Sequence, residues 1–176
     1  CEGAGVLVLE EYGHALDRGA SILGEIIGYH TCCDGSHMTS PSTQGMHRCM
    51  QGALESAGCK GIELDYINAH ATGTRIGDMA ESRAIRMICG DSVPVSATKG
   101  YTGHTLAASG AMEIIFSLLM MKNSVIIPTL HLEKVDPECG GIFHVKEKIR
   151  QEVKKVMSSN FAFGGINATL ILQKMK

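Results

Sequence analysis

Short apolar runs of strand length alternate with longer segments of helical periodicity along this chain, and this alternation restricts the fold more than any other feature. The strand-like runs in the first two thirds of the chain are 5–11, 21–30, 64–69 and 93–98. The segments with an apolar stripe at helical spacing are 44–57, 78–89 and 104–121. Strands separated by helices of this length pair in parallel through helical crossovers. The pattern therefore predicts an α/β fold, with a layered mixed sheet covered by helices.

The last third of the chain is richer in strands. The candidate strands there are 124–130, 142–145, 153–160 and 167–174. The glycine-bearing stretch "FAFGGI" joins the last two, which predicts a hairpin. The run at 5–11 is predicted to be a buried strand. Asp78 and Glu81 have the spacing of a capping box, so the second long helix is expected to begin there.

Composition narrows the class of protein. The chain has 176 residues, of which 44% are apolar and 19% charged, and this composition is typical of a globular domain. A net charge of −2 without a basic cluster argues against a nucleic-acid partner. The longest apolar run, Ile114–Met121, is too short to span a bilayer, so no membrane partner is expected. Seven cysteines without zinc spacing favour a reducing, intracellular location.

Two histidines and a lysine follow predicted strands. His70 comes after 64–69, Lys99 comes after 93–98, and His104 is expected to open the next helix. In α/β sheets, ligand sites gather beyond the carboxyl ends of the strands. The sequence therefore predicts that these three polar groups meet at one edge of one sheet.

The expected position of His104 at a helix N-terminus affects its protonation state. The positive end of a helix dipole disfavours the imidazolium form, so His104 is predicted to be neutral near pH 7. Two neutral imidazoles that donate to one carbonyl oxygen would stabilise an enolate or oxyanion. Two other interpretations stay open. The histidines could be structural, or they could form a two-histidine metal site, for which no third ligand is evident.

Several motifs in a fixed order resemble the C-terminal half of a β-ketoacyl-[acyl carrier protein] synthase, a condensing enzyme of the thiolase superfamily. The resemblance covers essentially the whole chain, so 1–176 is expected to be the C-terminal domain of such an enzyme. It implies a thiolase-like fold, in which this chain forms one half of a pseudo-dimer. The motifs that carry it are "EGAGVLVLEE", "DGSHMTSP", "NAHATGTRIGDMAE", "SATKGYTGHTLAASGAME", "IIPTLHLE" and "FAFGGIN".

The resemblance implies roles at the matching positions. His70 and His104 would be the active-site histidines that stabilise the malonyl-derived enolate, and Lys99 would orient them. Glu113 would be the acidic companion of the lysine. The positions implied to bind substrate are Thr72 and Thr74 at the phosphopantetheine arm, Phe161 as the gate of the acyl pocket, and Gly164 and Gly165 near the oxyanion hole. The family commonly has glycine where Ala71 and Ala162 stand, and both added methyl groups are expected to be tolerated.

The nucleophilic cysteine of such enzymes lies in their N-terminal half, and none of the seven cysteines here has its sequence context. The chain is therefore expected to be a fragment that is inactive alone and to need the missing N-terminal half. The implied reaction is the decarboxylative Claisen condensation of an acyl thioester with malonyl-[acyl carrier protein] in fatty-acid biosynthesis. The alternatives are a non-catalytic chain-length-factor-like subunit, the ketosynthase part of a polyketide synthase, and a hydrolase or metal enzyme built on the two histidines.

The resemblance also implies partners and a location. Acyl carrier protein would deliver the substrate on its phosphopantetheine, so no further cofactor and no metal are expected. The full-length protein would be a homodimer. Its location would be intracellular: cytoplasmic, or plastid or mitochondrial if the source is a eukaryote.

Overall fold

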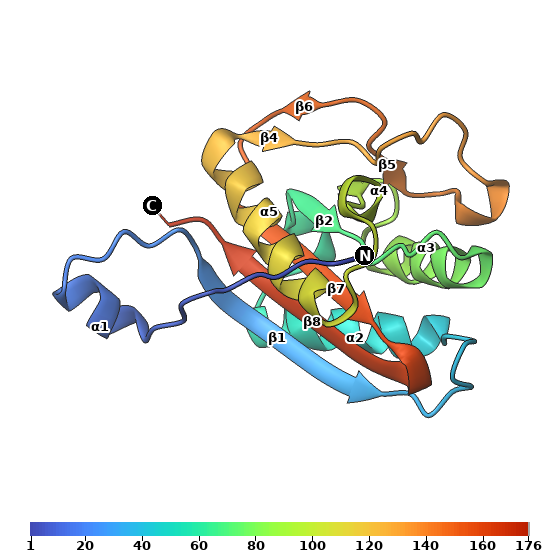
Figure 1. Cartoon of the computed structure of the whole chain (residues 1–176), viewed down its shortest axis with the longest axis horizontal. Helices are drawn as coiled ribbons and strands as arrows, with labels where there is room; N and C mark the ends of the chain where they lie inside the picture. The colour runs from blue at the N-terminus through green and yellow to red at the C-terminus, as the bar shows by residue number, and fades with distance from the viewer. Residues whose placement is uncertain (176) are drawn as a thin grey trace.

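The computed structural model describes residues 1–175 and is built around a six-stranded mixed sheet with strand order β1-β8-β7-β2-β3-β5 (Figure 1). Its strands are β1 (Glu25–Cys33), β2 (Tyr66–Asn68), β3 (Pro94–Ser96), β5 (Phe143–His144), β7 (Lys155–Phe161) and β8 (Ile166–Gln173). The strands β7, β2, β3 and β5 run parallel to one another, whereas β8 is antiparallel to both β7 and β1. The carboxyl ends of β7, β2 and β3 therefore share one edge.

Helices cover both faces of the sheet. On one face α2 (Thr43–Ala57) packs against β1 and β8, and α3 (Arg75–Cys89) packs beside α2. On the other face α5 (Ser109–Asn123) packs against β7 (Figure 1). Each face has its own apolar core, one rich in α2 and α3 side chains and one rich in α5 side chains. This arrangement confirms the predicted layers of helix and mixed sheet.

Shorter elements connect these layers. They are α1 (Tyr12–Asp17), η1 (Gly61–Glu63), α4 (Lys99–Thr102), η2 (Leu106–Ala108), η3 (Pro137–Cys139) and η4 (Phe163–Gly165). A separate two-stranded sheet consists of β4 (Val125–Ile126) and β6 (Ile149–Arg150). The predicted strand at 124–130 is therefore only two residues long, and it does not join the main sheet.

Local sequence explains where α2 begins and ends. The Ser42 side chain accepts a hydrogen bond from the Gly45 N–H and caps the first turn. Gly58 follows the last turn with φ 62°, a left-handed conformation that glycine adopts without a steric cost. The helix predicted over 44–57 is confirmed to within one residue.

The predicted strand at 5–11 is wrong. This segment is not part of a sheet, and the side chains of Val6 and Val8 are 85% and 86% exposed. It runs beside the first turn of α5, where Gly5 lies against Ala111 (Figure 1). Apolar β-branched residues alone do not make a strand, because a strand also needs a neighbour with free N–H and C=O groups. No described segment pairs with it.

Two predicted helix starts are also wrong. The helix α3 begins at Arg75 with Thr74 as its N-cap, so Asp78 and Glu81 lie within the helix rather than capping it. The segment after Lys99 forms the short helix α4 and then η2, and α5 begins only at Ser109. His104 therefore lies in the connection between α4 and η2. Asp78 accepts a hydrogen bond from the Gly73 backbone N–H just before the N-cap, whereas Glu81 bonds to the backbone of His70 and Ala71.

Candidate active site

The three parallel strands bring the predicted polar residues together. His70 follows β2 by two residues, Lys99 opens α4 just after β3, and Phe161 ends β7. The ring centroids of His70 and His104 lie 5.4 Å apart with their planes at 88°, and the ring of Phe161 lies 6.1 Å from that of His70. The strand-end positions of the two histidines predicted that they meet at one sheet edge, and the structure shows this meeting.

Both imidazoles are neutral at physiological pH. Burial lowers the pKa of His70 to about 3, and the positive charge of Lys99 contributes to that shift. The pKa of His104 also lies below its ordinary value, first because of burial and then because of Lys99. The expected neutral state of His104 therefore has a different cause from the one predicted. It results from desolvation and a nearby cation, not from a helix N-terminus.

The hydrogen bonds of His104 determine which ring nitrogen carries the proton. The backbone N–H of Leu106 donates to His104 Nδ1 over 3.3 Å, and the Ser109 hydroxyl lies 3.0 Å from the same nitrogen. A nitrogen that accepts a hydrogen bond from a backbone N–H is unprotonated, so the proton resides on Nε2. His104 therefore presents an N–H donor from its opposite side.

A buried ion pair lies next to the two histidines. Lys99 Nζ pairs with Glu113 Oε1, and both side chains are almost fully buried. The other oxygen of Glu113 accepts a hydrogen bond of 2.9 Å from the side-chain amide of Asn160. Burial raises the pKa of Glu113 above its usual value, and Lys99 opposes that rise. Sequence reasoning did not single out Asn160, which it read only as the end of a strand.

The two threonines of the site lie where the loop after His70 enters α3. The hydroxyls of Thr72 and Thr74 are 3.0 Å apart and bond to each other, and Thr74 is exposed. The Thr74 side chain makes no capping hydrogen bond to α3. These groups therefore remain at the surface near the histidine pair, where they can bind a polar chain.

The glycine-rich turn joins β7 to β8 beside the histidines. Gly164 and Gly165 have φ values of 80° and 78°, which accounts for the glycines at both positions. The Gly164 N–H donates to the carbonyl of Met38 over 3.2 Å, so in this conformation it is not free to donate to a ligand. Phe161 is buried against His70, whereas Phe163, two residues on, is 72% exposed.

Glu81 is a residue that sequence reasoning assigned wrongly, as part of a capping box. One of its carboxylate oxygens accepts from the His70 backbone N–H and the other from the Ala71 backbone N–H, each over 2.7 Å. The side chain is only 3% exposed, and burial raises its pKa to about 7 despite these two bonds. No local sequence signal distinguishes this role from a helix cap, because the bonded residues lie ten and eleven positions earlier.

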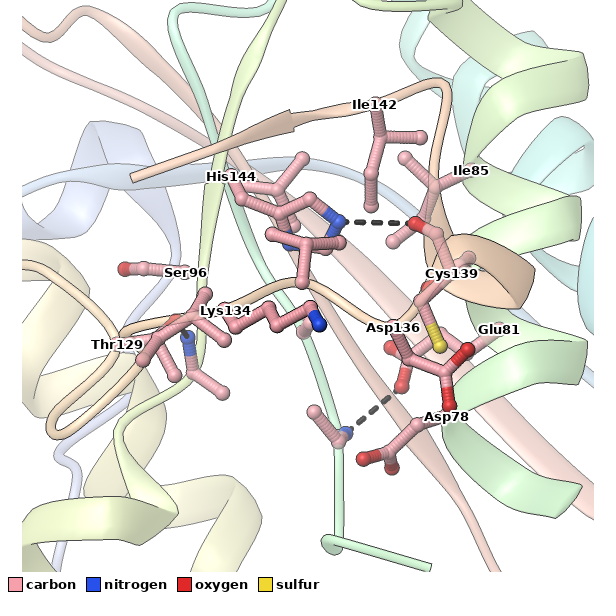
Figure 2. A pocket seen from close by; sticks show the side chains of 17 residues that line it. Asp78, Glu81, Ile85, Ser96, Thr129, Lys134, Asp136, Cys139, Ile142 and His144 are labelled. Carbon is pink, nitrogen blue, oxygen red and sulfur yellow. Dashed lines mark hydrogen bonds between the residues drawn. The ribbon is translucent and has the colours of Figure 1, made fainter. Parts of the chain in front are cut away.

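A cavity of about 230 Å³ lies behind the segment that carries His70. Ala69 and Ala71 line it and His70 does not, so the imidazole lies on the other side of this segment. Figure 2 shows Asp78 and Glu81 facing the cavity from α3, with Asp136 and Cys139 close by. The cavity therefore lies behind the segment that carries His70, and not on the side where His70 and His104 meet.

Two other kinds of feature are missing from residues 1–175. No helix in this range is both long and apolar enough to cross a membrane. Within the same range, no three His, Cys, Asp or Glu side chains are grouped so that they could bind a metal ion.

Known proteins resemble the chain in sequence and in structure. The family described as "Beta-ketoacyl synthase, C-terminal domain" matches residues 23–133. The 3-oxoacyl-[acyl-carrier-protein] synthase 1 of Escherichia coli (strain K12) is 45% identical over 99% of this chain and 42% of its own length. The chain thus spans less than half the length of this curated relative.

Solved structures agree with that similarity. A β-ketoacyl synthase from Burkholderia phymatum STM815 superposes with a TM-score of 0.93 and 45% identity, over 95% of this chain and 41% of that one. A type II polyketide ketosynthase, solved in complex with its acyl-carrier protein, superposes with a TM-score of 0.88 and 30% identity. It matches 95% of this chain and 42% of its own.

Proposed function

The chain belongs to the β-ketoacyl synthase family, with a thiolase-like fold, and on that premise we propose that the protein containing it is a 3-oxoacyl-[acyl carrier protein] synthase. The reaction is a decarboxylative Claisen condensation in fatty-acid biosynthesis, in which malonyl-[acyl carrier protein] extends an acyl thioester by two carbons. The observation that carries this proposal is the pair of neutral imidazoles whose rings meet 5.4 Å apart at one sheet edge.

The two histidines act on the thioester carbonyl of the malonyl group. When the bond to the carboxyl carbon breaks, carbon dioxide leaves and the electron pair moves into an enolate. The Nε2–H of His104 donates to the enolate oxygen, and His70 is the second donor. Neutral donors that are already positioned stabilise this developing charge without reorganisation. The enolate carbon then attacks the acyl thioester carbonyl, and the thiolate leaves.

The remaining site residues hold these groups and the substrate. The ion pair of Lys99 and Glu113 orients the histidine network. The hydroxyls of Thr72 and Thr74 bind the phosphopantetheine arm. Phe161 forms a wall of the acyl pocket, and the turn at Gly164 and Gly165 lies beside the oxyanion. The phosphopantetheine of acyl carrier protein carries the substrate through these steps.

The nucleophile is a cysteine outside residues 1–176, in the N-terminal part of the same subunit. Of the cysteines in the chain, Cys1 comes near the site, because its backbone nitrogen lies 3.2 Å from the His104 carbonyl oxygen. Cys1 lies in the segment 1–11, which forms no helix or strand, and not at the start of a helix, where a thiolate would be stabilised. A Cys1→Ser variant of the full-length protein is therefore expected to keep its condensing activity.

The partners follow from this function. Acyl carrier protein delivers both substrates, the N-terminal part of the subunit completes the site, and two full-length subunits form a dimer. The exposed side chains of Val6 and Val8 support contact with that N-terminal part. Residues 1–176 act as its C-terminal companion domain, in the cytoplasm or in a plastid or mitochondrion.

Decarboxylation of malonyl-[acyl carrier protein] by the full-length protein tests this proposal. The variants His70→Ala and His104→Ala should each lower kcat by about 10²–10³ while remaining folded, because each removes one donor to the enolate. Normal decarboxylation by both variants would refute the assigned roles. Residues 1–176 alone should form no 3-oxoacyl product. If the full-length protein decarboxylates malonyl thioester but accepts no acyl group, it is a chain-length-factor-like subunit instead.

A further inference from the structure

Two cysteines face each other where β1 packs on α2. Cys32 lies near the end of β1, and Cys49 lies in the middle of α2. The Cys32 thiol donates to the Gly45 carbonyl over 3.7 Å, and Gly45 is one helical turn before Cys49. The Cys49 thiol donates to the His30 carbonyl over 3.3 Å, and His30 is two residues before Cys32. Each sulfur therefore reaches the backbone of the other element, close to the position of the other cysteine.

Glycines bring the backbones of these two elements close together. A Cβ atom at Gly52 would lie 2.5 Å from the His30 ring, and one at Gly28 would lie 2.5 Å from the Ala53 carbonyl oxygen. Alternate residues of a strand share a face, so His30 and Cys32 both point toward α2. A disulfide requires Cα atoms about 4.4–6.8 Å apart. We infer that the close approach at these glycines brings the facing cysteines into that range.

The two thiols have different environments. Cys49 is 0% exposed, whereas Cys32 is half-buried, and both are free in this structure. Burial raises the pKa of Cys49 to about 11, and the nearby Cys32 adds to that rise. Oxidants attack thiols that are accessible and ionised, so Cys32 is the thiol that reacts first. Cys49 is then the thiol within reach of the oxidised sulfur.

We propose that Cys32 and Cys49 form a reversible disulfide between β1 and α2 when the protein meets hydrogen peroxide. The Cys32 thiolate attacks one peroxide oxygen, so that an S–O bond forms, the O–O bond breaks and hydroxide leaves. The Cys49 sulfur then attacks the Cys32 sulfenic acid. The S–S bond forms, the S–O bond breaks, and the hydroxyl leaves as water with the proton of Cys49. Two electrons pass from the two sulfurs to the peroxide, and thiols of a reducing compartment reverse the change.

The disulfide acts on the glycine-rich turn through the end of β1. The side-chain amide nitrogen of Asn167 lies 4.0 Å from the Cys32 sulfur and donates to the Asp34 carboxylate over 3.0 Å. The Asp34 backbone N–H in turn donates to the Gly165 carbonyl over 3.0 Å. A bond to Cys49 draws Cys32 toward α2 and away from Asn167, which weakens the attachment of Asp34 to the turn. This effect on activity rests on the proposed function, whereas the disulfide itself does not.

Peptide mapping of the full-length protein tests the disulfide directly. After hydrogen peroxide and alkylation of the remaining thiols, mass spectrometry should find one peptide pair linked through Cys32 and Cys49, and dithiothreitol should separate it. Cys33→Ser is the matched control. Cys33 is exposed and directs its thiol to the Gly164 carbonyl, 3.6 Å away, rather than to α2. This variant should form the same linked pair. Absence of the pair in the wild type, or a link through Cys33 instead, would overturn the proposal.

Activity of the oxidised protein tests the effect on the turn. Cys32→Ser and Cys49→Ser keep the same nucleophile as the wild type, so they show how much activity peroxide removes by oxidising other thiols. The kcat for malonyl-[acyl carrier protein] decarboxylation should fall about fivefold further in the wild type than in either variant, the size of one weakened hydrogen bond. Dithiothreitol should restore that part.

Equal losses in the wild type and in both serine variants would overturn the effect on the turn. Cys32→Ser alone makes this comparison if Cys49→Ser does not fold, because Cys32 is only half-buried. If the reduced wild type fails to decarboxylate malonyl thioester, the proposed function fails, while the linked peptides still decide whether the disulfide forms.

Discussion

His70 and His104 meet edge to face, with ring centroids 5.4 Å apart and planes at 88°, although they lie far apart along the chain. Each reaches the meeting point from the end of a different parallel strand or from the loop beyond it. The perpendicular arrangement lets the edges of both rings approach one small polar group. Desolvation keeps both rings neutral, so neither repels the other and each can donate a hydrogen bond.

The first prediction concerns stability at acidic pH. Burial lowers the pKa of His70 to about 3 in the folded protein, whereas an unfolded chain has the ordinary value of 6.5. The unfolded state therefore binds more protons between these values, and the contribution of His70 is full above pH 6.5 and is lost as the pH falls toward 3. A His70→Gln variant should lose less stability than the wild type as the pH falls through the upper part of this range. Parallel unfolding curves of the two proteins over that range would contradict the assignment.

Glu81 should give the opposite pH dependence. Burial raises its pKa to about 7, above the ordinary 4.5, so the folded state binds more protons between these values. Its contribution to stability is full below pH 4.5 and is lost as the pH rises through 7. Removing the carboxyl by Glu81→Gln should therefore flatten the unfolding free energy between about pH 5 and 8, and an unchanged slope would show that another group titrates there. The titratable groups that face it are Asp78 on α3, Lys99 at the sheet edge, and Lys134, Asp136, Cys139 and His144 around the cavity.

The buried ion pair should respond strongly to single substitutions. Glu113→Gln leaves Lys99 charged and buried, and Lys99→Met leaves the Glu113 carboxylate without its cation. Each should destabilise the protein by about 3 kcal/mol in urea unfolding, because an uncompensated charge stays buried. The double variant should be less destabilised than the sum of the two. Additive losses would mean that the pair is not coupled.

Ser109 should affect activity through the tautomer of His104. Its hydroxyl lies 3.0 Å from His104 Nδ1 and 3.1 Å from the Thr105 hydroxyl. Ser109→Ala should lower kcat about fivefold, the size of one lost hydrogen bond, while the Leu106 N–H continues to favour the proton on Nε2. Thr105→Val is the control, because it removes the neighbour of Ser109 without removing a bond to the histidine. ¹⁵N chemical shifts of the His104 ring should reveal more of the other tautomer only in Ser109→Ala.

The contact of β1 with α2 depends on a glycine. A Cβ atom at Gly28 would lie 2.5 Å from the Ala53 carbonyl oxygen and 2.7 Å from the Ala57 nitrogen. Backbone atoms cannot yield as a flexible side chain can, so Gly28→Ala should destabilise the protein by about 2 kcal/mol. Gly110 in α5 is the control, since a Cβ there meets only ordinary contacts with Asn160. Gly110→Ala should leave the unfolding free energy unchanged or raise it, and equal losses in both variants would contradict the close approach at Gly28.

Much of the fold follows from patterns that span a few turns of chain. The apolar stripe of 44–57 predicted α2 to within one residue. The hairpin of β7 and β8 was likewise evident from its strands and its glycine-rich turn. Both signals are local, and the structure adds only the surface on which each element packs.

The errors arose where local patterns have more than one tertiary solution. The run at 5–11 has the composition of a strand, but a strand is completed by a neighbour, and no described segment supplies one. Asp78 and Glu81 have the spacing of a capping box, yet Thr74 is the N-cap residue of α3 and Glu81 bonds to the backbone after β2. The sequence predicts the start of α5 at position 104 instead of 109, because Leu106 and Ala107 of η2 continue the apolar stripe.

The sequence alone determined the class of fold, the family resemblance and the placement of His70, Lys99 and His104 beyond neighbouring strands, because strand periodicity and chain order dictate which ends share a sheet edge. Only the tertiary structure decided the cause of the histidines' neutral state, the tautomer of His104 and the role of Glu81. These properties depend on burial and on hydrogen bonds between residues that the chain order keeps apart, and no local pattern encodes the distance between them.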